Sequence, residues 1–217
     1  MVAAEEKQPD LARQLAPLIE NHRGQVAVSV KHLETGEAFE HRADAPMPTA
    51  SLIKFPLMVA AYQAIDEKRC AQSEVVELQQ EDKVPGSGIL TDNFSPGTQI
   101  SLHDAIQLMI VHSDNTATNL VINRVGLDRT ASLMTSLGLE NTKLHSKVFR
   151  RDTSIFPERS KQFGLGSTTA GEMVALLAQL HERKLVSADA SEKMLTHLKA
   201  CNDRSKLCRH LPTNVDV

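Results

Sequence analysis

The sequence is poor in aromatic residues and has no excess of positive charge. Phe, Trp and Tyr make up 3% of the 217 residues, with no Trp and one Tyr. Nucleic-acid-binding surfaces stack bases on aromatic rings and neutralise phosphates with Lys and Arg. This chain has 24 basic against 27 acidic residues, a formal net charge of −3. These shortages argue against a general nucleic-acid-binding protein.

The chain also lacks a long apolar run and a metal-binding motif. No apolar stretch approaches the roughly 18 to 20 residues that a membrane-spanning helix needs. Residues 1–9 are polar and acidic, so no signal peptide is visible,. The three cysteines, Cys70, Cys201 and Cys208, have no His at zinc-finger spacing,. We therefore expect no membrane span, no metal and no other cofactor. A Cys201–Cys208 disulfide is geometrically possible and stays open.

Apolar periodicity predicts one helix, then a β-hairpin, then a large helical block. Four apolar residues recur at helical spacing over 10–22,. Three valines alternate with other residues over 26–30, and 37–41 can return as the second strand of a hairpin,. Nearly every later segment up to about residue 200 reads as helix, namely 50–65, 101–112, 116–125, 128–137 and 168–183,. This order predicts an α+β fold rather than a parallel βαβ fold.

One stretch interrupts the helical block. Between Leu144 and Ser167 the sequence is polar, has no clear period and is longer than most structureless loops,. We predict a functional or Ω-type loop there. The Arg150-Arg151 pair within it fits a solvated loop face better than a phosphate site.

The strongest chemical signal is Ser51-Leu52-Ile53-Lys54 at the start of an apolar helix. Positions i and i+3 share a helical face, so we expect the Ser51 hydroxyl and the Lys54 ammonium to be neighbours. A serine nucleophile needs a base, and lysine can be that base if burial lowers its pKa. The first helical turn also aims backbone N–H groups at developing negative charge. A helix-capping serine followed by a snorkelling lysine would show the same pattern.

A second signal, His112-Ser113-Asp114-Asn115, lies between two predicted helices. Ser113 could pass a proton between Lys54 and a leaving nitrogen, and Asn115 offers a donor and an acceptor to a substrate amide. Ser, Asp and Asn are also the residues that interhelical turns prefer, so capping alone would explain this motif taken by itself.

Together, these motifs resemble the class A β-lactamases and related penicillin-recognising serine enzymes. The resemblance rests on three motifs: Ser-x-x-Lys at the start of an apolar helix, Gly-Ser-Gly-Ile-Leu at 86–90, and Ser-Asp-Asn-Thr-Ala-Thr-Asn-Leu at 113–120. It runs from about residue 25 to 185. It implies an antiparallel sheet with helices, an all-helical domain and an active site between them. It also implies a small-molecule β-lactam or peptidoglycan-peptide substrate and a periplasmic or secreted location.

The resemblance assigns roles to individual positions. Ser51 matches the nucleophile, Lys54 the general base or proton relay, and Ser113 the proton shuttle. Asn115 matches the residue that contacts the substrate amide, and Ser87 lies where the lip of the cleft is expected. Asp114 is expected to brace the turn that carries the second motif.

The sequence departs from the family in the Ω loop. Class A β-lactamases carry there a Glu, four residues after a Leu, that activates the deacylating water. Counting from Leu144 puts Val148 at that position, and the nearest carboxylates are Asp152 and Glu158. Glu158 could be the catalytic base if the loop is rearranged; otherwise it is a solvated loop carboxylate. Without a base the enzyme would acylate and stall, as transpeptidase-like relatives do with penicillins.

A second departure concerns the C-terminal portion. The family's Lys-Thr-Gly or Lys-Ser-Gly is absent, although Leu211-Pro212 resembles the segment leading to it. We expect an incomplete sheet, with the helix and hairpin in 1–43, the helical domain in 44–200 and a return segment in 201–217. The uncovered hairpin edge would favour self-association or a complementing C-terminal fragment.

Three functions fit the sequence. The first is a serine β-lactamase-like hydrolase that opens β-lactam rings through an acyl-enzyme on Ser51. The second is a penicillin-binding or peptidoglycan-peptidase-like protein that acylates without fast deacylation. The third is a non-catalytic scaffold that binds a cell-wall peptide or a partner protein.

Overall fold

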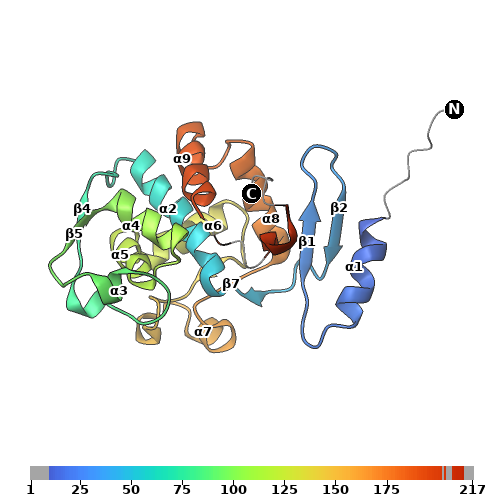
Figure 1. The fold of residues 1–217 in the computed structure, drawn as a ribbon, viewed down its shortest axis with the longest axis horizontal. Helices are drawn as coiled ribbons and strands as arrows, with labels where there is room; N and C mark the ends of the chain where they lie inside the picture. The colour runs from blue at the N-terminus through green and yellow to red at the C-terminus, as the bar shows by residue number, and fades with distance from the viewer. Residues whose placement is uncertain (1–9, 202, 204–206, 213–217) are drawn as a thin grey trace.

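The computed structural model describes residues 10–201, 203 and 207–212. Figure 1 shows a helical body with a hairpin and one helix at its right-hand end. The described helices are α1 (Leu11–Glu20), α2 (Lys54–Asp66), α3 (Leu90–Asn93), α4 (Leu102–Val111), α5 (Asn115–Val125), α6 (Leu127–Ser136), α7 (Pro157–Phe163), α8 (Ala170–His181) and α9 (Ala188–Lys199). The described strands are β1 (Val28–Lys31), β2 (Ala38–His41), β3 (Met47–Pro48), β4 (Val75–Glu77), β5 (Gln99–Ser101), β6 (Lys143–Leu144) and β7 (Gly166–Thr168). The predicted α+β class is confirmed.

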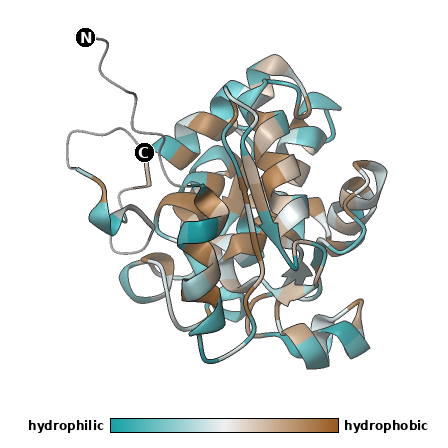
Figure 2. Ribbon diagram, turned by 90° about the vertical axis from the view of Figure 1, so that its right-hand side faces the viewer, coloured by the Kyte–Doolittle hydropathy of each residue, from teal (hydrophilic) through white to brown (hydrophobic). Residues whose placement is uncertain are grey.

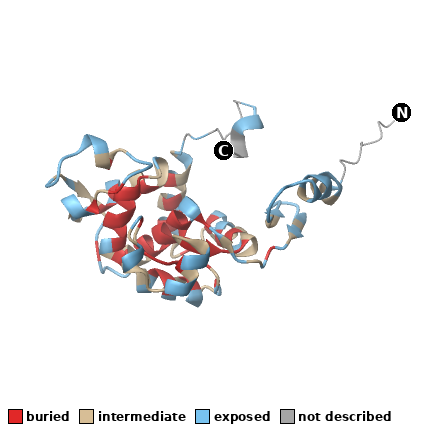
Figure 3. Ribbon diagram, turned by 90° about the horizontal axis from the view of Figure 1, so that it is seen from below, coloured by how far each residue is buried: buried red, intermediate tan, exposed pale blue. Residues whose placement is uncertain are grey.

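Helix α2 lies at the centre of the helical body and contacts α4, α5, α6 and α9. Ten of its residues are buried, including Leu57 and Met58, which are fully inaccessible. A helix that is apolar on all sides must be surrounded by other elements, which is why α2 is central. Brown apolar segments run through these packed helices in Figure 2, and red buried residues fill the same body in Figure 3.

The predicted hairpin is confirmed, as is the helix before it. Strands β1 and β2 pair antiparallel from Val28 opposite His41 to Lys31 opposite Ala38. Within the described residues this sheet has two strands, and α8 contacts β1. The hairpin and α1 are largely exposed, and Val30 keeps 39% of its surface accessible. The expected self-association and the complementing fragment stay predictions.

The predicted helices are found, and local sequence explains where they begin and end. Ser101 caps α4 by accepting the Asp104 N–H, and Thr169 caps α8 by accepting the Glu172 N–H,. Gly126, with φ of 94°, ends α5,. Strands β3 to β7 were not predicted, because two or three residues are too few to show a period of two,.

The stretch between Leu144 and Ser167 is an Ω-type loop, as predicted. Its ends meet because β6 pairs antiparallel with β7. Strand β7 also pairs with β3, which leads into the one-turn 3₁₀ helix η1 (Ala50–Ile53). A Cβ on Gly166 in β7 would lie 2.8 Å from the Cγ1 of Ile53, so only glycine permits this close approach,. The pairing therefore places the loop beside Ser51.

Three further findings concern the described residues only. No described helix is long and apolar enough to cross a bilayer. No group of three or more His, Cys, Asp or Glu side chains in the described ranges could hold a metal ion. Cys70 is buried and Cys201 is exposed, both as free thiols, whereas the side chain of Cys208 lies outside the described part of the chain.

Candidate active site

Ser51 is exposed and lies in η1, immediately before α2. The turn is anchored by Ile53, which is 1% exposed and belongs to the core. Ala50 precedes the serine in the left-handed region, with φ of 44°. Such a conformation costs free energy in a residue with a Cβ and is typical of functional sites. The fold thus holds Ser51 at the surface, on a turn that the buried side chain of Ile53 attaches to the core.

Lys54 is buried directly beneath this turn, with 2% of its surface exposed. Its Nζ donates to the Ser113 carbonyl oxygen at 2.6 Å, to Ser113 Oγ at 3.1 Å and to Asn115 Oδ1 at 2.9 Å. Burial lowers the pKa of Lys54 to about 8, and the charge of Asp114 partly opposes that shift,. A neutral, proton-accepting amine is therefore accessible near neutral pH.

The structure joins the side chain of Lys54 to the second motif rather than to the nucleophile. The Lys54 backbone N–H donates to the Ser51 carbonyl, but among the described residues no hydrogen bond links the two side chains. Ser113 adopts a left-handed conformation, with φ of 51°, and this turn brings both its carbonyl and its hydroxyl to Nζ. Helical spacing alone could not show this long-range contact.

Asp114 braces the turn, as expected. One carboxylate oxygen accepts the N–H groups of Ile89 at 2.6 Å and Leu90 at 2.9 Å, and the other accepts that of Ala117 at 2.8 Å. The carboxylate thereby caps α5 and ties it to the segment before α3. Asp114 is 1% exposed, so these hydrogen bonds are shielded from water,.

Asn115 joins three parts of the site and is 8% exposed. Its Oδ1 accepts from Lys54, its Nδ2 donates to the Pro85 carbonyl at 2.9 Å, and its backbone N–H donates to the Ser87 carbonyl at 2.9 Å. Oδ1 can accept one further hydrogen bond and Nδ2 can donate one further hydrogen bond, which leaves both atoms able to bind a substrate amide. Ser87 is exposed and contributes its backbone carbonyl to this arrangement.

Gly88 is required for this bracing, and Gly88→Ala tests it. A Cβ there would lie 2.3 Å from the Asp114 Cγ and 2.7 Å from its Cα, at a φ of 125°. We expect Gly88→Ala to cost about 2 kcal/mol or more of stability and to disturb the site. Gly97→Ala is the control, because Gly97 has φ of 88° but nothing within 4 Å of the added atom. Equal losses in thermal unfolding would show that backbone strain alone matters.

Ser51 lines a cavity of about 280 Å³ whose far wall is the Ω-type loop. The residues around this space, called here the acyl cavity, are Ala50, Ser51, Asn115, Ser146, Lys147, Val148, Phe149, Arg151 and Leu165. None of these described lining residues is a carboxylate. Ser113 and Ser87 are outside this set. Of the loop residues in this wall, the sequence pointed to Val148, as the position expected for the glutamate, but not to its neighbours as part of the site.

Val148, the residue at the expected glutamate position, lies in this wall and is 5% exposed. Buried Asn119 holds it in place: the Val148 N–H donates to Asn119 Oδ1 at 2.8 Å, and Asn119 Nδ2 donates to the Val148 carbonyl at 3.3 Å. Sequence reasoning missed the role of Asn119, although its position four residues after Asn115 on α5 could have suggested a shared face.

Glu158 is not brought to the acyl cavity. It lies in the first turn of α7, and its side chain is 84% exposed and paired with Lys161 at 2.7 Å. The geometry gives it no contact with Ser51 through which to activate a water.

We expect Glu158→Gln to leave both acylation and acyl-enzyme turnover unchanged within about twofold, because exposed ion pairs contribute little free energy. Turnover of a chromogenic cephalosporin by the variant and the parent chain is the measurement. A selective slowing of deacylation would return Glu158 to the mechanism.

The known sequences that resemble this chain are described as β-lactamases. A sequence model described as "Beta-lactamase enzyme family" matches residues 10–217. Beta-lactamase SME-1 of Serratia marcescens is 26% identical over 146 residues, which are 66% of this chain and 49% of that protein. A β-lactamase of Streptomyces lavendulae is 28% identical over 128 residues, 57% of this chain and 41% of the relative. The chain spans about half the length, or less, of these curated relatives.

Solved structures show the same fold. A β-lactamase from Sphaerobacter thermophilus DSM 20745 matches with a TM-score of 0.81 at 31% identity, covering 93% of this chain and 73% of that one. The structure of PBP-A matches with a TM-score of 0.83 at 24% identity, covering 95% of this chain and 74% of that one, a likeness of fold.

Proposed function

Since the chain belongs to the β-lactamase enzyme family, we propose that it is a serine acyl-transfer protein that forms an acyl-enzyme on Ser51 with β-lactams. The observation that carries this proposal is the buried Lys54, hydrogen-bonded to Ser113 and Asn115 beside the cavity that Ser51 lines. The family also supports a periplasmic or secreted location as part of the proposal.

Acylation would use these groups in a fixed order. Neutral Lys54 receives the Ser51 proton, directly or through a water, as Oγ forms a bond to the β-lactam carbonyl carbon. The carbonyl carbon–nitrogen bond breaks, and the proton passes from Lys54 through Ser113 Oγ, 3.1 Å away, to the leaving nitrogen. Asn115 would hold the amide of the acyl side chain with its free hydrogen-bonding positions. The product is an ester of Ser51 that retains all atoms of the β-lactam.

The wall of the acyl cavity favours slow hydrolysis of this ester. A deacylating water needs a base, which contributes typically about 10²- to 10⁴-fold to rate. Val148 stands in the wall, and the described lining holds no carboxylate. This observation favours a penicillin-binding protein that acylates and stalls over a hydrolase with fast turnover.

The proposal predicts a pH dependence for acylation. Lys54 accepts a proton only when neutral, and burial lowers its pKa to about 8. The rate should rise about tenfold per pH unit from pH 6 and level off above about pH 8. Rapid-quench labelling between pH 6 and 9 measures this profile. The acylation rate of Lys54→Arg should not rise with pH in this way, because the guanidinium group stays protonated throughout. An unchanged pH dependence in that variant would exclude Lys54 as the base.

Incubation with a fluorescent penicillin separates the three candidate functions. Stable labelling of one residue, Ser51, supports the penicillin-binding protein. Rapid release of hydrolysed product without stable labelling supports the hydrolase. Neither labelling nor hydrolysis supports the non-catalytic scaffold and contradicts the proposal.

A further inference from the structure

Two cations in the wall of the acyl cavity have no assigned role. Resting on the proposed function, we propose that Lys147 and Arg151 make the site selective for acyl donors that carry a carboxylate on the acyl side chain. The preferred substrate class is therefore a β-lactam or peptide-like acyl donor with an extra negative charge on the acyl side of the scissile bond.

The position of the acyl cavity indicates which part of the substrate it receives. Its lining includes Ser51, where the acyl group is attached, and Asn115, which would hold the acyl amide. It does not include Ser113, which would protonate the leaving nitrogen. The acyl side chain, rather than the part of the β-lactam that carries the leaving nitrogen, would therefore lie in the cavity, against 146–149 and Arg151 of the loop.

The charge in this wall has one sign, and neither cation forms an ion pair among the described side chains. Lys147 and Arg151 are the charged residues among the described lining, and neither has a carboxylate partner among the described side chains. The nearest acidic group in sequence, Asp152, is paired with Arg150 at 3.0 Å. The hydrogen bond from Arg150 lowers the pKa of Asp152, and the nearby charge of Lys147 adds to that effect without forming an ion pair. The Arg150-Arg151 pair is thus divided: Arg150 lies in the solvated ion pair, whereas Arg151 borders the cavity.

The size of the selectivity follows from the exposure of the two cations. Arg151 is exposed and Lys147 is half-buried, so each should favour a nearby carboxylate as a surface charge does, by about three- to fivefold,. Two such charges give a preference of about tenfold. Salt should weaken it, since the Debye length falls from about 10 Å at 0.1 M to about 3 Å at 1 M.

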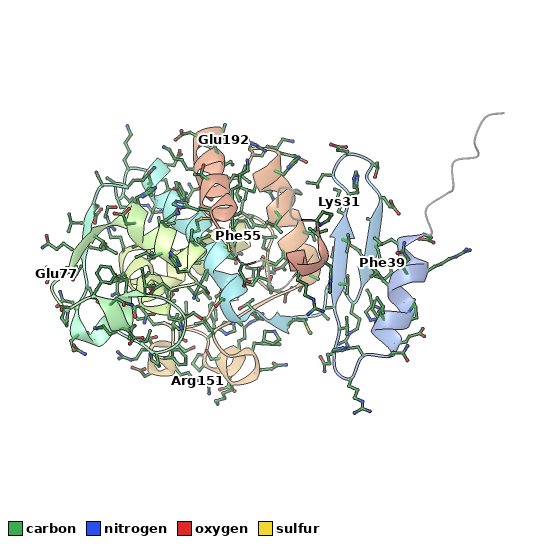
Figure 4. The ribbon with its side chains drawn as sticks, viewed as in Figure 1. Lys31, Phe39, Phe55, Glu77, Arg151 and Glu192 are labelled. Carbon is green, nitrogen blue, oxygen red and sulfur yellow. The ribbon has the colours of Figure 1, made fainter. Side chains whose placement is uncertain are left out.

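Benzylpenicillin and its α-carboxy derivative, which differ by one carboxylate on the acyl side chain, are matched probes. With the parent chain, the second-order rate of Ser51 acylation should be about tenfold higher for the α-carboxy compound. Lys147→Gln and Arg151→Gln should each reduce this ratio about three- to fivefold, because each variant removes one of the two charges. Lys31→Gln removes the same charge from the hairpin, in a different part of the molecule (Figure 4), and should leave the ratio unchanged.

Binding to the Ser51→Ala variant separates this inference from the proposed function. Its equilibrium affinity, measured by titration calorimetry, should favour the α-carboxy compound in the same way, and Lys147→Gln and Arg151→Gln in that background should reduce the preference. Failure of the parent chain to acylate, with the charge preference retained in binding, overturns the proposed function alone. Equal affinities and rates for the two penicillins, or a ratio that Lys31→Gln changes as much as Arg151→Gln, overturn the charge selectivity.

Discussion

Ser51→Ala should abolish covalent labelling by penicillin, because the serine hydroxyl oxygen is the atom that bonds to the β-lactam carbonyl carbon. The mass of the variant should then be the same with and without penicillin. The fold should persist. Ser51 is exposed on its turn, and it caps neither η1, whose N-cap is Thr49, nor α2, whose N-cap is Ile53. The loss of its hydroxyl should therefore change the free energy of unfolding by about 0.5 kcal/mol or less. Intact-mass measurement after incubation with benzylpenicillin, together with circular dichroism, tests both statements.

Ser87→Ala is the matched control for that experiment. Ser87 is also an exposed serine beside the site, but its contact with Asn115 uses the backbone carbonyl, which alanine keeps. The control should label at the parent rate within about threefold, a change of less than 1 kcal/mol. Labelling that survives in Ser51→Ala would place the nucleophile elsewhere and contradict the interpretation of the Ser51–Lys54 motif.

Val148→Glu should accelerate hydrolysis of the acyl-enzyme by about 100-fold or more, because it adds a general base to the wall of the cavity. Val148 is 5% exposed, and burial raises the pKa of a carboxyl group toward neutrality,. Asn119 holds the backbone of Val148, not its side chain, so the substitution keeps both hydrogen bonds. The decay of the adduct after removal of free penicillin is the measurement.

Val148→Gln separates the chemistry from the change of shape. Glutamine has the length and polarity of glutamate but cannot accept the proton of a water at neutral pH. The acyl-enzyme of Val148→Gln should therefore decay near the parent rate. Similar acceleration in both variants would mean that opening the wall to water, rather than a base, limits deacylation.

Much of the fold could be predicted because its signals are local. The apolar stretch that became α2, the Ser101 cap of α4 and the glycine after α5 each act within a few residues. The short strands β6 and β7 depend on pairing across the whole Ω-type loop, which two or three residues do not reveal. The pairing matters, because it sets the loop against the turn that carries Ser51.

The motifs named the residues of the candidate site but not the contacts between them. Ser51, Lys54 and Ser113 could be named from their motifs, yet the burial of Lys54 beneath three acceptors depends on the left-handed turn at Ser113. The sequence could not show that Arg151 borders the cavity while Arg150 does not, since consecutive loop residues have no fixed faces.

The most direct test of the account is the time course of intact mass for the parent chain mixed with a small excess of benzylpenicillin, followed by peptide mapping. The account predicts one adduct with the full mass of the penicillin, located on the peptide that contains Ser51, which persists after the free compound is removed. An adduct on another peptide, no adduct at all, or complete hydrolysis of the penicillin without an accumulating adduct would contradict it.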